Sequence, residues 1–129
     1  ILGEEEDAYN SDPMPSCIYG NNEIMHVGPH ADQLVKEFKP QGKEVSVSYS
    51  QLVANPIAQA YGCNQGWIKV TWVEGKVYSV AGWGHGVSHL LTAATIMVQQ
   101  HWEGNRNIFA HPTLEESLKN ALLAKREIL

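Results

Sequence analysis

Apolar residues recur along the chain with two different periods, one typical of helices and one typical of strands. Residues 30–38 follow the helical spacing i, i+3, i+4, i+7, with apolar side chains at Ala31, Leu34, Val35 and Phe38. Pro29 stands near the first turn of this segment and Pro40 beyond its end, as is common around a helix. Residues 43–50 instead alternate polar residues with Val45, Val47 and Tyr49. This period of two predicts a half-buried strand.

The middle of the chain has the pattern of an antiparallel hairpin. Residues 66–73 and 76–83 are rich in valine and aromatic residues, and Glu74-Gly75 separates the two runs. A two-residue connection that ends in glycine is a strong signal for a tight hairpin turn. One face of the first run carries Ile68, Val70 and Trp72. Residues 17–28 hold two shorter apolar segments around a Gly-Asn-Asn turn, and we expect these to be strands as well.

Two helices are expected after the hairpin. Residues 88–102 begin with Ser88 as a cap and carry an apolar stripe of Leu91, Ala94, Val98 and Trp102. A last helix is predicted over about residues 113–125, with an apolar face of Leu114, Leu118, Ala121 and Leu122. Residues 51–65 show no clear period, and Pro56 argues against a long regular element there. This order of elements predicts the α+β class, an antiparallel sheet with helices packed on it.

Composition indicates one folded domain. The chain has 129 residues, of which 43% are hydrophobic and 18% charged. A net charge of −5 gives no electrostatic basis for nucleic acid or an anionic membrane as partner. No apolar run approaches the roughly 20 residues of a membrane span. We assign residues 1–15 to a linker or tail and residues 16–129 to the domain. Because the chain starts at Ile1 without a methionine, we expect a piece of a longer protein.

Cysteine and histidine positions exclude some kinds of site. Cys17 and Cys63 lie far apart without CxxC spacing, which favours two reduced thiols and a cytoplasmic protein. His85 and His89 have the i, i+4 spacing of helical metal ligands, but Gly86 and the cap after it place the first outside the helix. The sequence also lacks the glycine-rich turns that hold dinucleotides. We therefore predict no metal site and no dinucleotide site in this chain.

The segment Phe109–Leu123 has two interpretations. In the structural one, Thr113 and Glu116 form a capping box, in which the threonine side chain and the glutamate each satisfy a free backbone N–H. Acidic residues in the first helical turn also suit the helix dipole. In this interpretation Pro112 fixes the direction in which the chain enters the helix.

In the functional interpretation, Glu116 accepts a hydrogen bond from the imidazole of His111 and fixes its tautomer. An X-Pro bond such as His111-Pro112 can be cis, which would turn the imidazole relative to the helix. This pair would be the base and the orienting group of a catalytic triad whose nucleophile is missing. Neither cysteine has a claim to that role from its sequence position. The residues alone leave both interpretations open.

Three stretches of the chain carry a family resemblance. Residues 109–122, FAHPTLEESLKNAL, resemble the C-terminal signature of dihydrolipoamide dehydrogenases, members of the flavin-dependent pyridine nucleotide-disulfide oxidoreductases. Residues 7–28, DAYNSDPMPSCIYGNNEIMHVG, resemble the entry to the same domain in that family. Residues 66–91, GWIKVTWVEGKVYSVAGWGHGVSHLL, resemble its hairpin and the helix that follows. Order and spacing agree over about residues 9–123.

The resemblance implies a C-terminal dimerisation domain that pairs with itself as a homodimer. In the family, other domains bind FAD and NAD and carry the redox-active cysteine pair, and the histidine before the proline serves the partner subunit's active site. By this resemblance His111 would be the acid/base, Glu116 its orienting partner, and the His111-Pro112 bond cis. An ordinary imidazole titrates near pH ~6.5, which suits proton exchange with a dithiol. The isolated domain would be inactive, because the electron chemistry belongs to cofactors that it does not bind.

Some positions depart from the family pattern. Phe109 stands where the family has a first histidine, and Asn22 stands where proline is usual. These departures loosen the assignment of lipoamide as the substrate, but they do not affect the assignment of the domain. The alternative is a non-catalytic association module that keeps the fold while His111 and Glu116 serve only the helix cap.

Overall fold

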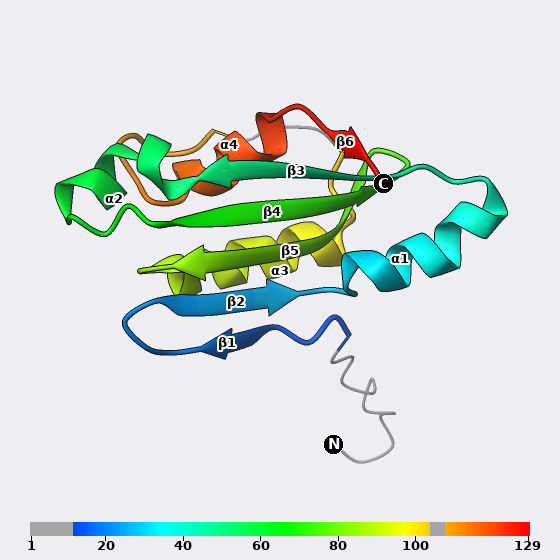
Figure 1. Cartoon of the computed structure of the whole chain (residues 1–129), viewed down its shortest axis with the longest axis horizontal. Coiled ribbons are helices and arrows are strands. Elements are labelled where there is room, and N and C mark those ends of the chain that lie inside the picture. The colour runs from blue at the N-terminus through cyan, green and yellow to red at the C-terminus, as the bar shows by residue number, and fades with distance from the viewer. Residues whose placement is uncertain (1–11, 104–107) are drawn as a thin grey trace, which may run out of the picture.

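The computed structural model describes residues 12–103 and 108–129, and its centre is a six-stranded antiparallel sheet with the order β1-β2-β5-β4-β3-β6 (Figure 1). The strands are β1 Ser16–Ile18, β2 Glu23–Val27, β3 Val45–Gln51, β4 Gly66–Val73, β5 Lys76–Gly84 and β6 Glu127–Ile128. The helices are α1 Ala31–Phe38, α2 Pro56–Ala60, α3 Leu91–Gln99 and α4 Glu116–Leu123. Three 3₁₀ segments complete the fold, η1 Lys39–Gln41, η2 Leu52–Ala54 and η3 Val87–Leu90. The predicted α+β class is confirmed. Residues 1–11 of the predicted tail lie outside the described residues.

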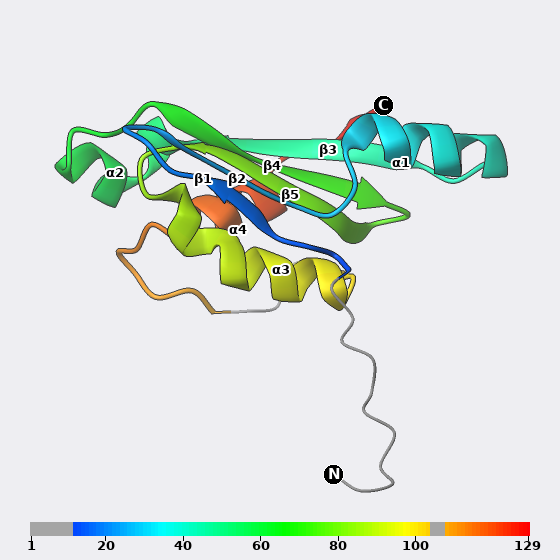
Figure 2. The ribbon, with the colours of Figure 1, turned by 90° about the horizontal axis from the view of Figure 1, so that it is seen from below.

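The main core lies between the sheet and two helices. Figure 2 shows α3 and α4 on the same side of the sheet. The predicted face of β4, with Ile68, Val70 and Trp72, is buried there against side chains of these helices such as Ala94 and Leu118. Full burial of a large apolar side chain contributes roughly 1.5–3 kcal/mol. The helices are therefore held to the sheet mainly by apolar packing.

A smaller cluster fixes α1. Leu34 and Phe38, on the predicted apolar face of this helix, pack against Val45 of β3 and Val73 of β4. In β3, Val45 points to the opposite side from Ser48, because side chains alternate along a strand. Helix α1 thus covers one end of the sheet face that α3 and α4 leave open.

The predicted hairpin is present as β4 and β5. Glu74 and Gly75 form its turn with φ values of 50° and 76°. Positive φ at both central residues is the requirement of a type I′ turn, whose twist matches the flanking strands. The glycine meets this requirement without the steric cost that a side chain brings.

Strand β3 is placed as predicted, but it is not half-buried. Ser46, Ser48 and Ser50 are buried. The last two face α4, where the Ser48 hydroxyl donates to the carbonyl of Ala121 (2.6 Å) and the Ser50 hydroxyl to that of Ser117 (2.6 Å). A period of two identifies a strand, but it cannot say that a helix will cover the polar face. Small hydroxyls fit there because helix carbonyls satisfy them.

Helix boundaries also differ from the prediction. Ser88 lies within η3 and caps no helix through its side chain, and α3 starts only at Leu91. The backbone N–H of Ser88 donates instead to Glu23 Oε2 (2.9 Å), so a strand residue satisfies this helix start. Helix α4 spans Glu116–Leu123, shorter than the predicted 113–125. The short helix α2 was not predicted. No helix among the described residues is long and apolar enough to cross a membrane.

Candidate acid–base site

The loop before α4 presents His111 at the surface. Phe109 and Leu114, on either side of it, pack against the main core and anchor the two ends of the loop. The His111-Pro112 peptide bond is cis, as the resemblance implied. The His111 side chain is 72% exposed, and the Glu116 side chain only 13%. The loop therefore exposes the imidazole while the carboxylate stays sheltered against the protein.

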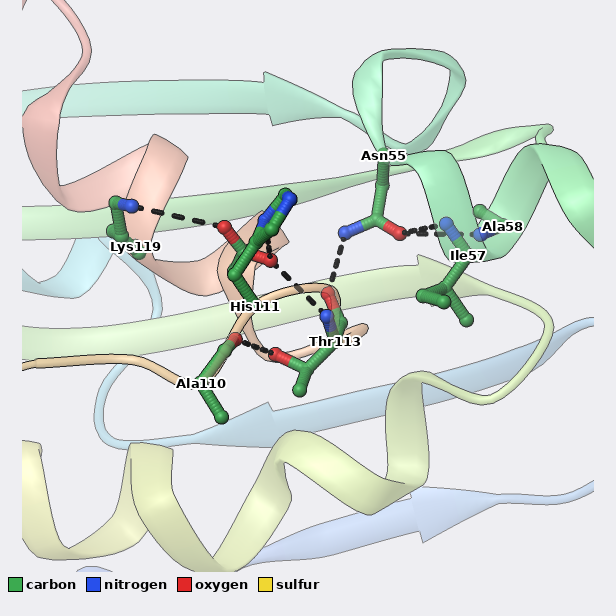
Figure 3. Close-up of polar contacts among 8 residues, drawn as sticks. Asn55, Ile57, Ala58, Ala110, His111, Thr113 and Lys119 are labelled. Carbon is green, nitrogen blue, oxygen red and sulfur yellow. Dashed lines mark hydrogen bonds and ion pairs between the residues drawn. The ribbon is translucent and has the colours of Figure 1, made fainter.

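The two predicted site residues are in contact. His111 Nδ1 lies 2.8 Å from Glu116 Oε1 (Figure 3). The same carboxylate oxygen accepts the backbone N–H of Thr113 at 3.1 Å, and Lys119 Nζ lies 3.7 Å from Oε2. Because a carboxylate oxygen accepts, the proton of a neutral imidazole is placed on Nδ1. Among the described residues Nε2 makes no hydrogen bond, so this nitrogen is available at the exposed side chain.

The capping box forms only in part. Glu116 reaches back to the Thr113 N–H, as the motif requires, but the Thr113 hydroxyl donates to the carbonyl of Ala110 (2.8 Å). The N-cap of α4 is Glu115, which makes no side-chain cap hydrogen bond. One carboxylate oxygen therefore serves the backbone and the imidazole together. The structural and functional interpretations do not compete for it.

Hydrogen bonding keeps Glu116 ionised. Its pKa is lowered from the ordinary value of 4.5, chiefly by the hydrogen bond from the Thr113 N–H. Partial burial acts in the opposite direction, while His111 and Lys119 lower the pKa further. A charged form that accepts hydrogen bonds is favoured over the protonated form. The imidazole thus has an anionic partner over a wide pH range.

Asn55 holds the loop from the other side, although no sequence motif pointed to it. Its side chain is fully buried, and Oδ1 accepts the backbone N–H groups of Ile57 (3.0 Å) and Ala58 (3.1 Å) at the start of α2. Its Nδ2 donates to the Thr113 carbonyl (2.9 Å), as Figure 3 shows. Asn followed by Pro is a common helix start, and this signal could have located α2 and its cap.

The two cysteines, and the two histidines considered above as metal ligands, are not part of the acid–base pair. Cys17 and Cys63 are both free. Cys63, His85 and His89 line a cavity of about 420 Å³ between α2 and the start of α4, together with Leu114 and Glu115. Within residues 12–103 and 108–129, no cluster of three or more His, Cys, Asp or Glu side chains has a metal-binding arrangement. A larger cavity of about 600 Å³ beside α1 is not lined by the acid–base pair.

Acidic residues lie at or near the starts of three helices in this domain. Asp32 lies in the first turn of α1, Glu116 in that of α4, and the Glu23 carboxylate binds the backbone N–H of Ser88 ahead of α3. A dinucleotide pyrophosphate normally sits on free N–H groups at such a position. Carboxylates there repel a phosphate. These three helix starts are therefore unfavourable places for the pyrophosphate of FAD or NAD.

A family model and a curated relative match this chain. The model described as the pyridine nucleotide-disulphide oxidoreductase dimerisation domain matches residues 14–122. A dihydrolipoyl dehydrogenase of Chlorobaculum tepidum is 25% identical over 126 residues, covering 94% of this chain and 26% of that protein.

Two solved structures share the fold. LpdA from Mycobacterium tuberculosis superposes with a TM-score of 0.77 at 18% identity, over 94% of this chain and 27% of that one. The HOCl-induced flavoprotein disulfide reductase RclA from Escherichia coli gives 0.77 at 17% identity, over 88% of this chain and 27% of that one. The chain thus spans about a quarter of the length of these relatives. Because the family model covers most of its residues, the chain belongs to the pyridine nucleotide-disulphide oxidoreductase family, as its dimerisation domain.

Proposed function

We propose that this chain is the dimerisation domain of a flavin-dependent, dihydrolipoyl dehydrogenase-like disulfide oxidoreductase. In a homodimer, His111 and Glu116 would supply an acid/base pair to the disulfide site of the partner subunit. The observation that carries the proposal is an exposed imidazole whose Nδ1 is held 2.8 Å from a sheltered, ionised carboxylate. That arrangement leaves Nε2 as a base directed to a reactant outside the chain.

The chemistry is proton transfer that accompanies thiol–disulfide exchange. His111 Nε2 accepts the proton of a substrate thiol, and the resulting thiolate sulfur attacks one sulfur of the disulfide. A mixed disulfide forms, the old S–S bond breaks, and the other sulfur leaves as a thiolate. In the reverse direction the imidazolium returns the proton to the substrate sulfur. Glu116 stabilises the imidazolium while it holds the proton.

The disulfide must come from outside this domain. Cys17 and Cys63 are single thiols, and neither contacts His111 in the described part of the chain. FAD and NAD, which would carry the electrons in the complete flavoenzyme, would bind to its other domains; the acidic residues at three helix starts here are consistent with this. A domain with a base but no reactant needs a partner that presents one.

Replacing His111 in the complete flavoprotein that carries this domain tests the proposal. We expect His111→Gln to lower dithiol-linked turnover by about 10²–10⁴-fold, the usual contribution of a general acid/base, while the dimer stays intact. The matched control is His85→Gln, since His85 is also exposed and lies outside the pair. Turnover would be followed by NAD reduction and assembly by sedimentation.

The second candidate is a non-catalytic association module. It is favoured by the bond from the Thr113 N–H to Glu116 Oε1, which serves the fold without any reaction. This candidate predicts equal turnover in His111→Gln, His85→Gln and the unchanged protein. Such a result would reject the acid/base role and leave the domain as an association surface.

A further inference from the structure

We infer that Asn55 is a positioning residue for the acid–base pair, an inference that rests on the proposed function of His111. Its side chain joins the start of α2 to the loop that presents the imidazole, across 58 residues of chain. Asn55 does not touch the imidazole. It acts through the backbone of Thr113, whose carbonyl accepts a hydrogen bond from Asn55 and whose N–H donates one to Glu116.

The orientation of the Asn55 amide follows from its partners. Its Oδ1 faces two donors, the N–H groups of Ile57 and Ala58. Its Nδ2 faces an acceptor, the carbonyl of Thr113 at 2.9 Å. A flipped amide would set N–H against N–H and oxygen against oxygen. A buried amide with both ends in use has a single favoured orientation, and this orientation directs its Nδ2 donor at the Thr113 carbonyl.

Thr113 passes this position on to the acid–base pair. Asn55 holds its carbonyl, and Glu116 Oε1 accepts its N–H at 3.1 Å. That oxygen also accepts from His111 Nδ1 at 2.8 Å. A shift of the Thr113 backbone would therefore change the position or the sharing of the oxygen that orients the imidazole.

Backbone hydrogen bonds and packing against the sheet support Asn55. Its N–H donates to the carbonyl of Leu52 (2.9 Å), and its own carbonyl accepts from Gln59 (3.1 Å). The fully buried Leu52 lies on two glycines that pair across β4 and β5, Gly66 and Gly84. A Cβ at Gly84 would come within 2.5 Å of the Leu52 side chain, so the glycine lets this contact form. Contacts from the sheet through Leu52 thus fix the position of Asn55.

This link has few substitutes. Among the hydrogen bonds of described residues 108–116, the Asn55–Thr113 bond is the one that reaches beyond the loop and α4. Apolar contacts of Phe109 and Leu114 also hold the loop, but such contacts lack direction. We assign the direction of the Thr113 carbonyl to the amide of Asn55, which binds it at 2.9 Å, whereas the Glu116 N–H within the loop lies 3.4 Å from it.

The test uses variants that keep the helix cap and lose the donor. Serine and aspartate are both strong N-cap residues, so Asn55→Ser and Asn55→Asp preserve an acceptor for α2. Serine is too short to reach Thr113, and an aspartate carboxylate cannot donate to its carbonyl. Asn120→Ser is the matched control, because Asn120 is exposed on α4 and serine has a similar helix propensity. If one Asn55 variant fails to fold, the other carries the test.

Steady-state kinetics of the complete flavoprotein give the first result. We expect both Asn55 variants to lower kcat about 10- to 100-fold with KM nearly unchanged, since a misplaced acid/base slows chemistry without weakening substrate binding. Asn120→Ser should match the unchanged protein. An unchanged kcat in a folded Asn55 variant would overturn the inference.

A double-mutant cycle distinguishes positioning from general destabilisation. If Asn55 acts through Glu116, then Asn55→Ser should have little further effect on kcat in a Glu116→Gln background. Fully additive losses would overturn the inference. His111→Gln, measured in the same assay, separates the two proposals: if it lowers turnover and Asn55→Ser does not, only the role of Asn55 fails. If His111→Gln has no effect, the proposed function fails, and the positioning role fails with it.

Discussion

A single carboxylate oxygen of Glu116 accepts from both the imidazole of His111 and the backbone of Thr113. Because of these hydrogen bonds, the contribution of Glu116 to the stability of the fold depends measurably on pH. Its pKa is lowered, chiefly by the Thr113 N–H, so the ionised form is favoured in the folded state. A depressed pKa means that its stabilising effect is complete above the ordinary glutamate value of 4.5 and is lost as the pH falls through the lower, folded value.

We therefore expect Glu116→Gln to flatten the acid limb of the stability curve below about pH 4.5. Urea unfolding at several acidic pH values would measure the effect. The matched control is Glu115→Gln, which changes the adjacent residue at the start of the same helix. If both variants change the slope equally, the hydrogen bonds to the Glu116 carboxylate are not the cause of the change.

At the same scale, the sequence allowed prediction of His111 and Glu116 but not of Asn55. The pair is five residues apart, and a motif can contain it. Asn55 reaches Thr113 across 58 residues, a contact that depends on how η2 and α2 sit on the sheet. No local pattern contains that information. The acid/base role itself stays a prediction until turnover is measured.

At the scale of elements, β3 and α4 are joined by hydroxyl groups in an apolar interior. Ser48 donates to the carbonyl of Ala121 and accepts from Trp72 Nε1 at 2.9 Å. Most strands and helices were located correctly because their apolar periods are clear, but α2 and β6 were not predicted. The burial of β3 was less predictable, because α4, which covers its serines, is distant in the sequence. The start of the helix after β5 was also less predictable, because Glu23, which accepts the Ser88 N–H there, is distant in the sequence.

Ser48→Ala should destabilise the domain by about 1–3 kcal/mol, since the buried indole N–H of Trp72 loses its acceptor. Ser46→Ala is the matched control, because Ser46 is also buried and its side chain makes no hydrogen bond to another described residue. Urea unfolding monitored by tryptophan fluorescence would measure both. If both variants lose the same free energy of unfolding, the loss comes from removing a buried hydroxyl and not from breaking the bond to Trp72.

At the scale of the whole molecule, the sheet has a second face that α1 covers only at one end (Figure 2). Ile24, Trp83 and Trp67 lie in register across β2, β5 and β4 on that face. Ile24 is 45% exposed, and the two tryptophans are partly exposed. Apolar surface in a row of this kind is typical of a region that another protein surface covers.

We expect the 129-residue chain to form a concentration-dependent dimer, as a domain of this family would if its interface is self-contained. Sedimentation equilibrium over a range of concentrations measures this directly. A monomer at every concentration would contradict a self-contained interface. It would imply that the association needs contacts outside this chain.

The serines of β3 also set the axial position of α4. Two residues of a strand advance about 6.6–6.8 Å, and four residues of a helix advance about 6.0 Å. Ser48 and Ser50 therefore reach carbonyls one helical turn apart, those of Ala121 and Ser117. The near-equality of these lengths means that α4 cannot slide along the strand without losing both bonds. Deleting one residue early in β3 would turn the hydroxyls to the opposite face and remove both bonds that fix the axial position of α4, whose first turn carries Glu116.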